Sequence, residues 1–428
     1  MAGLRVQHLT RTPGLALILV LAVAVRLAFA IVMYPWVAGR FSLDLHDPYD
    51  KIAANLVNGR GYVECAGDPP TLRRLPAYPL LLAGIFRVTG LSLRAVQIIQ
   101  ALLATATCLT VFLLAACLYE YAGIGLAAAA FTGLHPALIQ YAARYYTETL
   151  YTLLLALFVY SCTRALRAER AAPSTWRWVL SGICFGVATL TRGTAVLLPL
   201  VLALPIARRL DARRRMLVFA AFVGAAATVI VPWSTYASRL AGTPVLLSTW
   251  AAAPFYHGLY ASRRMLTGHS LGDLDAEANQ KLTGIVGSGD GLSPAAQVSR
   301  ERATMRVIQA EVRAAPGANV IAWLRGLGMV WIWGRSPWSM MLYLLLHVPV
   351  LVLAAIELRQ AHAPGELSVL VLTAGYFGVF HAIYYPQARY ILPVVPLLAI
   401  PAAATLLRPR AEDRVCEAIN ADMISHGR

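Results

Sequence analysis

The chain has 428 residues, of which 58% are hydrophobic and only 14% are charged, with a mean hydropathy of +0.61. This composition excludes an ordinary soluble domain and predicts an integral membrane protein. The formal charge of +16 comes almost entirely from arginine. The arginines cluster in short loops between apolar runs, which argues against a nucleic-acid partner and for a membrane topology signal. The six cysteines form no CxxC pair, so neither a disulfide framework nor a zinc site is indicated.

Apolar runs recur along the whole chain, many of them near the 17 to 25 residues that cross a bilayer. We predict an all-α polytopic protein of about ten transmembrane helices. Their expected ranges are 14–33, 95–118, 122–139, 147–166, 177–190, 193–207, 216–236, 338–357, 367–384 and 391–407. This arrangement puts the arginine-rich loops and both termini on the cytoplasmic side. It predicts a single transmembrane domain over 1–407 and a short tail over 408–428.

Two external loops, 35–94 and 237–337, are long enough to carry structure of their own. Each contains an apolar segment too short for a span: 76–88, broken by a proline, and 321–334, rich in tryptophan. Counting either as a crossing would place arginine-rich loops on opposite faces. We therefore expect both to be interfacial helices, a setting that tryptophan favours.

The first external loop carries the first candidate site residues: Asp44, Asp47, Tyr49 and Arg74. Ionisable groups held at a membrane surface usually mark a function or a pairing partner. Asp47 precedes Pro48, so it has a structural explanation as the N-cap of a short helix. Asp44 has no such local explanation.

The remaining candidates lie in the other external segments. They are Arg144, Tyr145, Glu148, Arg192, His257, Gln387, Arg389 and Tyr390. Each has a functional and a structural interpretation. Glu148 is either an active-site acid or metal ligand, or a helix-terminal carboxylate paired with Arg144. Arg192 is either a phosphate ligand or the partner of Glu148, and Arg389 either binds substrate or reaches for lipid phosphate.

Several motifs carry a family resemblance: Y-x-x-I-A-x-N-L, N-G-R-G-Y and R-x-P-x-Y-P-L-L-L-A, then T-E-x-L, then R-Y-x-L-P-x-x-P. In this order they resemble the GT-C membrane glycosyltransferases, in particular the dolichyl-phosphate-mannose protein mannosyltransferase and lipid A aminoarabinose transferase group (glycosyltransferase family 39-like). The resemblance implies a first-loop aspartate as general base. We expect Asp44 in that role, with Asp47 as alternate, and Glu148 as the second-loop acid. Arg192 and Arg389 match places where the family has phosphate-facing cations.

The resemblance implies an inverting glycosyltransferase that moves a hexose or pentose from a polyprenyl-phosphate donor to an acceptor hydroxyl. The acceptor would be a glycan, a lipid or a protein, and the active site would lie on the outer face of the inner (plasma) membrane. It also allows a divalent cation, with Glu148 as candidate ligand. Two alternatives remain: an outer-face glycan polymerase or ligase with pyrophosphate-linked donors, and a polyprenyl-lipid transporter.

Overall fold

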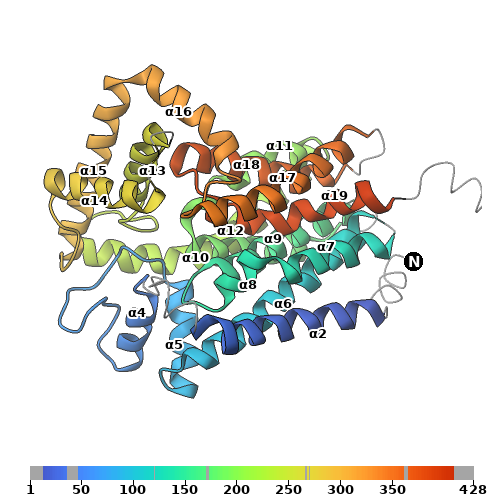
Figure 1. The fold of residues 1–428 in the computed structure, drawn as a ribbon, viewed down its shortest axis with the longest axis horizontal. Coiled ribbons are helices and arrows are strands. Elements are labelled where there is room, and N and C mark those ends of the chain that lie inside the picture. The colour runs from blue at the N-terminus through green and yellow to red at the C-terminus, as the bar shows by residue number, and fades with distance from the viewer. Residues whose placement is uncertain are drawn as a thin grey trace, which may run out of the picture.

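The computed structural model describes residues 13–35, 47–119, 121–169, 173–265, 268, 270–360 and 365–408. Every regular element in these ranges is helical (Figure 1). The prediction of an all-α polytopic membrane protein is therefore confirmed. Asp44, the favoured general base, lies outside the described residues.

Within these described ranges, seven helical segments are long and apolar enough to cross a membrane. They are α2 with the π-helix η1 (Pro13–Ala28 and Phe29–Met33), α6 (Leu93–Leu118), α9 (Glu148–Ala168), α12 (Ala212–Ala241), α17 (Pro337–Arg359), α18 (Leu367–Tyr384), and η3, η4 and α19 (Ala388–Tyr390, Leu392–Val394 and Val395–Leu407). The pair α7 (Ala122–Leu134) and α8 (Pro136–Ala142) makes an eighth, bent by 54°. The bend falls where a residue preceding proline is kept out of the helical conformation.

The predicted count of ten spans is not confirmed. The two remaining predicted spans, 177–190 and 193–207, correspond to α10 (Thr175–Thr191) and to η2 (Gly193–Ala195) with α11 (Leu198–Ala207). Neither is among the candidate spans by length and composition, since α10 has 17 residues and α11 has 10. Glycine brings α10 against α12, because a Cβ at Gly182 or Gly186 would collide with the α12 backbone or side chains. Small residues allow such close helix contacts in membranes.

The two predicted external loops gather at one end of the bundle. The first forms α4 (Tyr49–Val57) and α5 (Ala77–Thr89), and the second forms α13 (Ala252–Arg264), α14 (Leu271–Val286), α15 (Pro294–Ala314) and α16 (Pro316–Met329). The start of α2 and the end of α19 lie at the opposite end (Figure 1). That the segments of α5 and α16 lie in the membrane interface stays a prediction.

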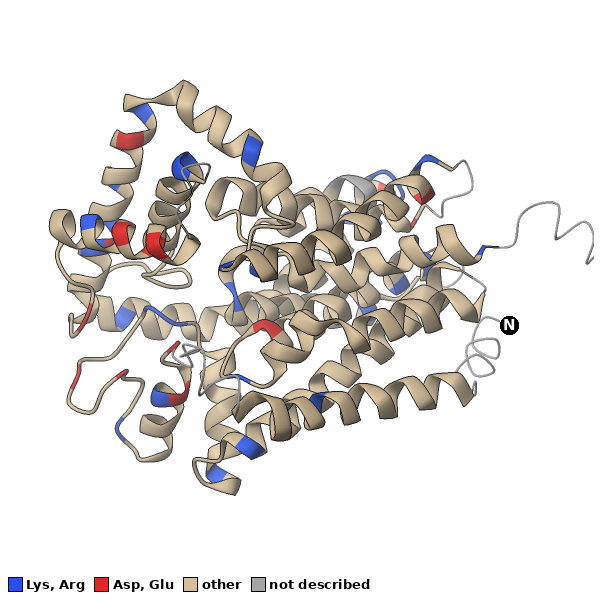
Figure 2. Cartoon of the chain, in the orientation of Figure 1, with Lys and Arg blue, Asp and Glu red and all other residues tan. Residues whose placement is uncertain are grey.

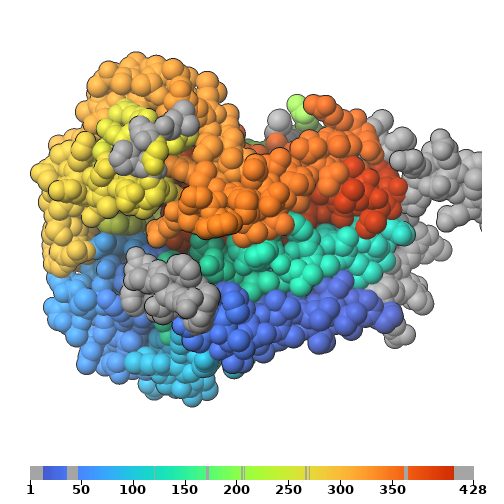
Figure 3. Space-filling view, in the orientation of Figure 1, coloured from blue at the N-terminus to red at the C-terminus, as the bar shows by residue number. Residues whose placement is uncertain are grey.

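The charged residues follow the same division. We call α4 and α5 of the first loop, together with α13 to α16 of the second, the loop layer. The long helices of the bundle are largely uncharged, whereas the loop layer carries many charges of both signs (Figure 2). The loop layer packs on the bundle end as a continuous surface (Figure 3). Glycine again allows close contact, since a Cβ at Gly258 of α13 or Gly326 of α16 would strike backbone in or just after α18. The loop layer is thus held tightly over one end of the bundle, where the candidate residues lie.

Candidate functional site

Asp47 does not cap the helix that follows it. The helix α4 begins at Tyr49, Pro48 occupies the cap position, and no side chain caps the helix. The Asp47 carboxylate turns instead towards Arg74, whose Nη2 donates to Oδ1 over 2.9 Å. The prediction of Asp47 as an N-cap is therefore wrong, because the ion pair across the loop takes up the side chain.

Glu148 is placed by a turn that two glutamines of α6 hold. Gln100 Nε2 donates to the carbonyls of Ala142 and Arg144, over 3.1 and 2.7 Å, and Gln97 Nε2 donates to Ala143 over 3.0 Å. The turn leads directly into α9, whose first residue is Glu148. The Glu148 side chain is fully buried. A carboxylate so far from water must have cationic or hydrogen-bonding partners.

The partners of Glu148 are Arg192 and Arg389, not the predicted Arg144. Arg192 Nη2 lies 2.8 Å from Glu148 Oε1, and Arg389 Nε donates to the same oxygen. Arg389 Nη2 also reaches Asp47 Oδ2 at 3.6 Å. The snorkelling interpretation of Arg389 is therefore wrong, whereas the pairing of Arg192 with Glu148 is confirmed.

These contacts join five residues into one arginine–carboxylate cluster, made of Asp47, Arg74, Glu148, Arg192 and Arg389. They come from the first loop, the start of α9, the end of α10 and the turn before α19. Among the described residues of the cluster, three cations face two carboxylates, which leaves one positive charge in excess within it. The three arginine side chains are only 12 to 14% exposed, and that of Asp47 is 27% exposed. The cluster is thus a preorganised, nearly dry cationic centre with an accessible edge.

Aromatic rings surround the arginines of the cluster. The ring centre of Tyr146 lies 4.2 Å from the Arg389 guanidinium carbon. The ring centre of Tyr390 lies 5.2 Å from the guanidinium carbon of Arg192 and 5.9 Å from that of Arg389. Tyr49 lies 5.7 Å from Arg74. Ring faces attract cations at such distances and keep water away. Tyr49 and Tyr390 were predicted as site residues, and both contact the cluster.

Four aromatic neighbours of the cluster were not predicted as site residues: Tyr141 and Tyr146 beside Arg389, Tyr151 beside Arg192 and Trp250 beside Arg74. Tyr151 lies 5.7 Å from Arg192, and Trp250 lies 5.5 Å from Arg74. Tyr151 follows Glu148 by three positions, so helical periodicity could have placed both on one face of α9. Trp250 lies in the long loop before α13, where no local pattern points to the cluster.

The surroundings keep Arg74 charged and Tyr49 neutral. Burial alone would lower the pKa of Arg74, but the nearby Asp47 carboxylate, with Tyr49 and Glu64, raises it above its usual value. Burial is also the main cause that raises the pKa of Tyr49, and the Asp47 charge adds to it. At neutral pH the site therefore presents a guanidinium beside a protonated phenol, and both groups are hydrogen-bond donors.

The other predicted residues do not join the cluster. Arg144 is buried beside it, and its Nε and Nη2 have no hydrogen-bond partner among the residues that the structure describes. Tyr145 packs against Phe86 in an apolar cluster. Gln387 is buried in the same turn as Arg389, but no hydrogen bond links its side chain to the described residues of the cluster. His257 lies in α13, and its buried Nε2 has no hydrogen-bond partner in the described part of the chain.

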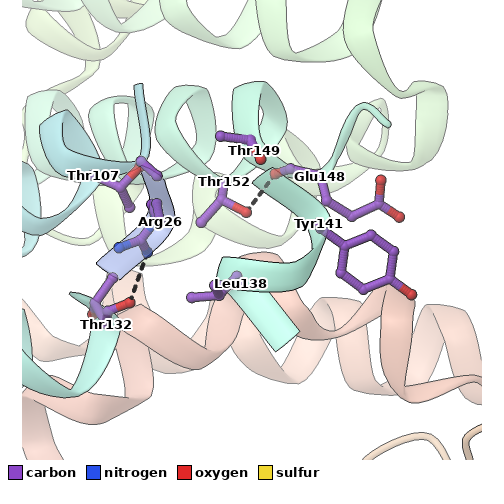
Figure 4. A pocket seen from close by; sticks show the side chains of 9 residues that line it. Arg26, Thr107, Thr132, Leu138, Tyr141, Glu148, Thr149 and Thr152 are labelled. Atoms are coloured by element: carbon purple, nitrogen blue, oxygen red, sulfur yellow. Dashed lines mark hydrogen bonds between the residues drawn. The ribbon is translucent and has the colours of Figure 1, made fainter. Parts of the chain in front are cut away.

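A small polar cavity of about 10 Å³ lies behind Glu148. Arg26, Thr107, Thr132, Tyr141 and Thr149 line it together with Glu148 (Figure 4). Arg26 and Thr132 lie on one side of this view, whereas the ends of Glu148 and Tyr141 point away from them. The cavity has room for about one water molecule. The carboxylate is therefore directed towards the arginines rather than into the bundle.

The residues around Glu148 do not fit a divalent cation. Two guanidinium groups already donate to its Oε1, so a metal ion there would face two like charges. No group of three or more His, Cys, Asp or Glu side chains suited to a metal ion occurs within the described ranges. The cluster is better suited to binding an anion, because guanidinium groups hold phosphate oxygens.

A family model described as dolichyl-phosphate-mannose-protein mannosyltransferase matches residues 69–256. No curated protein matches the chain. The structure is similar to an oligosaccharyltransferase from Archaeoglobus fulgidus, with a TM-score of 0.53 and 14% identity. That match covers 95% of this chain, which spans about half (51%) of the oligosaccharyltransferase.

A second solved structure in the comparison is ArnT from Cupriavidus metallidurans, at 16% identity and a TM-score of 0.37, covering 90% of this chain and 77% of that one. The family match includes Arg74, Glu148 and Arg192 of the cluster, whereas Asp47 and Arg389 lie outside it. The match over residues 69–256 and the shared fold confirm that the chain resembles the GT-C membrane glycosyltransferases and carries their fold.

Proposed function

We propose that the protein transfers a sugar from a polyprenyl-phosphate donor to an acceptor hydroxyl, with inversion at the anomeric carbon. The observation that carries this proposal is the cationic excess of the arginine–carboxylate cluster at one end of a membrane bundle. The family match over residues 69–256 supports a glycosyltransferase. Because the donor is a lipid with an anionic head, its chain stays in the bilayer while its phosphate reaches Arg192 and Arg389.

The arginines act on the leaving group. As the bond between the anomeric carbon and the phosphate oxygen breaks, negative charge grows on the departing polyprenyl phosphate. Cations that are already in place stabilise such charge without having to reorganise. Glu148 provides this order, because its buried Oε1 fixes Arg192 and Arg389. We assign Glu148 to the positioning of these arginines rather than to proton transfer.

The first loop supplies the base. Both oxygens of Asp47 already face guanidinium groups, those of Arg74 and Arg389, so this carboxylate holds the cations. We assign the general base to Asp44, three positions earlier in the chain. It would take the proton from the acceptor hydroxyl, whose oxygen attacks the anomeric carbon from the face opposite to the phosphate. A base must come within hydrogen-bond reach of that proton.

The location of the cluster supports an enzyme at the outer face of the membrane. Two arginine-rich segments, around 164–177 and 208–215, connect α9 to α10 and α11 to α12. Both lie at the end of the bundle opposite to the cluster, so they mark the cytoplasmic side. The cluster would then face outwards, in the inner (plasma) membrane. A transporter would place its polar residues near the middle of the bilayer, between structural repeats. The cluster lies instead at the end of the bundle, under the loop layer.

The test is donor turnover by the full-length protein in nanodiscs. A panel of polyprenyl-phosphate sugars, with and without glycan, lipid and peptide acceptors, is assayed for release of polyprenyl phosphate. We expect release by the wild type, near-complete loss in Asp44→Asn with donor binding retained, and a loss of donor affinity in Asp47→Asn. Turnover retained in Asp44→Asn but abolished with intact donor binding in Asp47→Asn would transfer the base to Asp47. Turnover of pyrophosphate-linked donors alone would overturn the proposal.

A further inference from the structure

A much larger cavity lies at the other end of the bundle. It measures about 290 Å³ and lies between α9, α10, α11 and α12. Its lining is apolar apart from Arg215. Trp178, Phe158 and Leu202 form a buried floor, each 1% exposed, whereas the rim residues Leu200 and Phe219 are 72% and 65% exposed. The cavity therefore has a closed apolar interior and an apolar mouth at the surface of the bundle.

The cavity is separate from the arginine–carboxylate cluster. Cys162 in its lining follows Glu148 on the same helix α9, at a distance of about 21 Å along the axis. Trp178 and Met216, from the first turns of α10 and α12, also line it. A donor whose phosphate is bound at Arg192 and Arg389 therefore has its head group at the opposite end of the bundle from this cavity's arginine.

Arg215 differs from the arginines near it. Arg214 is neutralised by Glu169, to which its Nε and Nη2 donate over 2.8 and 2.7 Å, and Arg209 pairs with Glu366 at 3.3 Å. Arg215 is exposed, and within the described residues its guanidinium donates only to the Leu210 carbonyl, at 3.2 Å. No ion pair connects it to a carboxylate within the described part of the chain. An apolar cavity thus has an uncompensated cation at its rim.

We propose that this cavity binds one acyl chain of an anionic glycerophospholipid, with the lipid phosphate held by Arg215. The exposed apolar rim allows a chain to enter from the bilayer, and the buried floor covers it once it is inside. The guanidinium at the rim selects an anionic head group at membrane depth. The bound lipid fills the space between α11 and α12 and so stabilises the short helix α11. This site is independent of the proposed transfer reaction.

The test is photolabelling of the full-length protein in phosphatidylcholine nanodiscs. The probe is phosphatidylglycerol with a diazirine in the middle of one acyl chain, and labelled peptides are identified by mass spectrometry. We expect labelling of α11 and α12 around Leu202 and Phe222, reduced by unlabelled phosphatidylglycerol and not by added phosphatidylcholine. Equal competition by phosphatidylcholine would overturn the proposal. So would preferential labelling of these helices by a diazirine polyprenyl phosphate, since the occupant would then be a prenyl chain.

Two variants and a matched control sharpen the result. Arg215→Gln removes the head-group contact, and Ala203→Trp fills the mouth of the cavity. We expect each to lower the labelling at least about tenfold. Arg213→Gln removes the same charge from the same turn of α12, but Arg213 is about 160° away around the helix and does not line the cavity. Labelling that stays unchanged in Arg215→Gln, an exposed substitution that should leave the fold intact, or falls equally in Arg213→Gln would contradict the proposal.

Discussion

The two ends of the bundle both carry arginines, but they use them differently. At the loop-layer end, Arg192 and Arg389 are nearly buried, share the oxygen of Glu148 and lie against tyrosine rings. At the opposite end, Arg213 and Arg215 are exposed at the start of α12. Exposed arginines there need only water or lipid phosphate as partners and serve to orient the chain.

Buried arginines are costly unless several partners compensate them. The loop-layer end joins its arginines and carboxylates into one network from four distant parts of the chain. The described ion pairs at the opposite end are separate one-to-one pairs: Arg209 with Glu366, Arg214 with Glu169 and Arg408 with Glu357. The difference indicates that the cluster end is built to hold positive charge where water is scarce. Such an arrangement suits an anionic substrate better than it suits stability alone. The following substitutions test this contrast between the two ends.

The largest effect is expected for Glu148→Gln. Loss of this carboxylate leaves Arg192 and Arg389 without their shared anion in a buried site, which costs about 3 to 5 kcal/mol of stability. Turnover should fall at least about 100-fold because the arginines lose their order. Thermal unfolding and donor turnover measure the two effects. The control at the other end is Glu169→Gln, which weakens the contacts with the more exposed Arg214 and with Trp178 Nε1 and should cost less, about 1 to 2 kcal/mol. Equal losses would contradict the contrast.

Arg389→Lys should come next. A lysine ammonium is a point charge and cannot bridge Glu148 and Asp47 as the planar guanidinium does. We expect kcat/KM for the donor to fall by about 10² to 10³ with little change in fold. Steady-state kinetics gives the ratio, and Arg213→Lys serves as the control that should leave it unchanged. If kcat/KM in Arg389→Lys equalled that of the wild type, the arginine would have no role in transfer.

Gln100→Leu tests the turn that precedes Glu148 and fixes its position. It leaves the carbonyls of Ala142 and Arg144 without their buried donor, and the Tyr78 hydroxyl without its acceptor. We expect a loss of about 1 to 3 kcal/mol. Gln97→Leu is the graded control, since its Nε2 donates to Ala143 and should cost less. Thermal unfolding ranks the two, and a larger loss in Gln97→Leu would show that a different contact fixes the turn.

The smallest effect concerns His257 in the loop layer. Burial, with Arg300 adding to it, lowers the pKa of His257 to about 4. Because the unfolded chain protonates His257 more easily than the folded protein does, the free energy of unfolding is highest above pH 6.5. It falls as the pH drops from 6.5 towards 4, with a slope of at most about 1.4 kcal/mol per pH unit. His257→Gln should flatten the fall in melting temperature across this range. An unchanged pH profile would mean that His257 does not titrate in the fold.

Much of the fold follows from the sequence because length and hydropathy dictate which segments can cross a bilayer. The ranges 14–33, 95–118 and 216–236 match α2 with η1, α6 and α12 within a few residues. Helices α10 and α11 were harder to interpret, because they are short and their packing depends on glycine contacts across the bundle. Neither local pattern nor composition shows whether such a pair crosses the membrane.

The candidate site was predictable as a set of residues, but not as a network. Glu148, Arg192 and Arg389 stood out because ionisable groups are rare beside apolar runs. The pairing of Arg192 with Glu148 was one of two interpretations, but the pairing of Arg389 was not predictable, since Arg389 lies far from Glu148 in the chain while Arg144 is near. Local spacing favoured Asp47 as a cap, but the tertiary contact with Arg74 took precedence. Long-range electrostatics decided each case in which the local pattern was wrong.

The most direct test of the cationic cluster is the affinity for a polyprenyl phosphate. Binding to the full-length protein is measured by thermophoresis for the wild type, Arg192→Gln, Arg389→Gln and Arg213→Gln, after thermal unfolding shows that each variant is folded. We predict that Kd rises at least about tenfold in each cluster variant, or about 1.4 kcal/mol, and stays unchanged in Arg213→Gln. Unchanged affinity in Arg192→Gln and Arg389→Gln, or an equal loss in Arg213→Gln, would contradict the account.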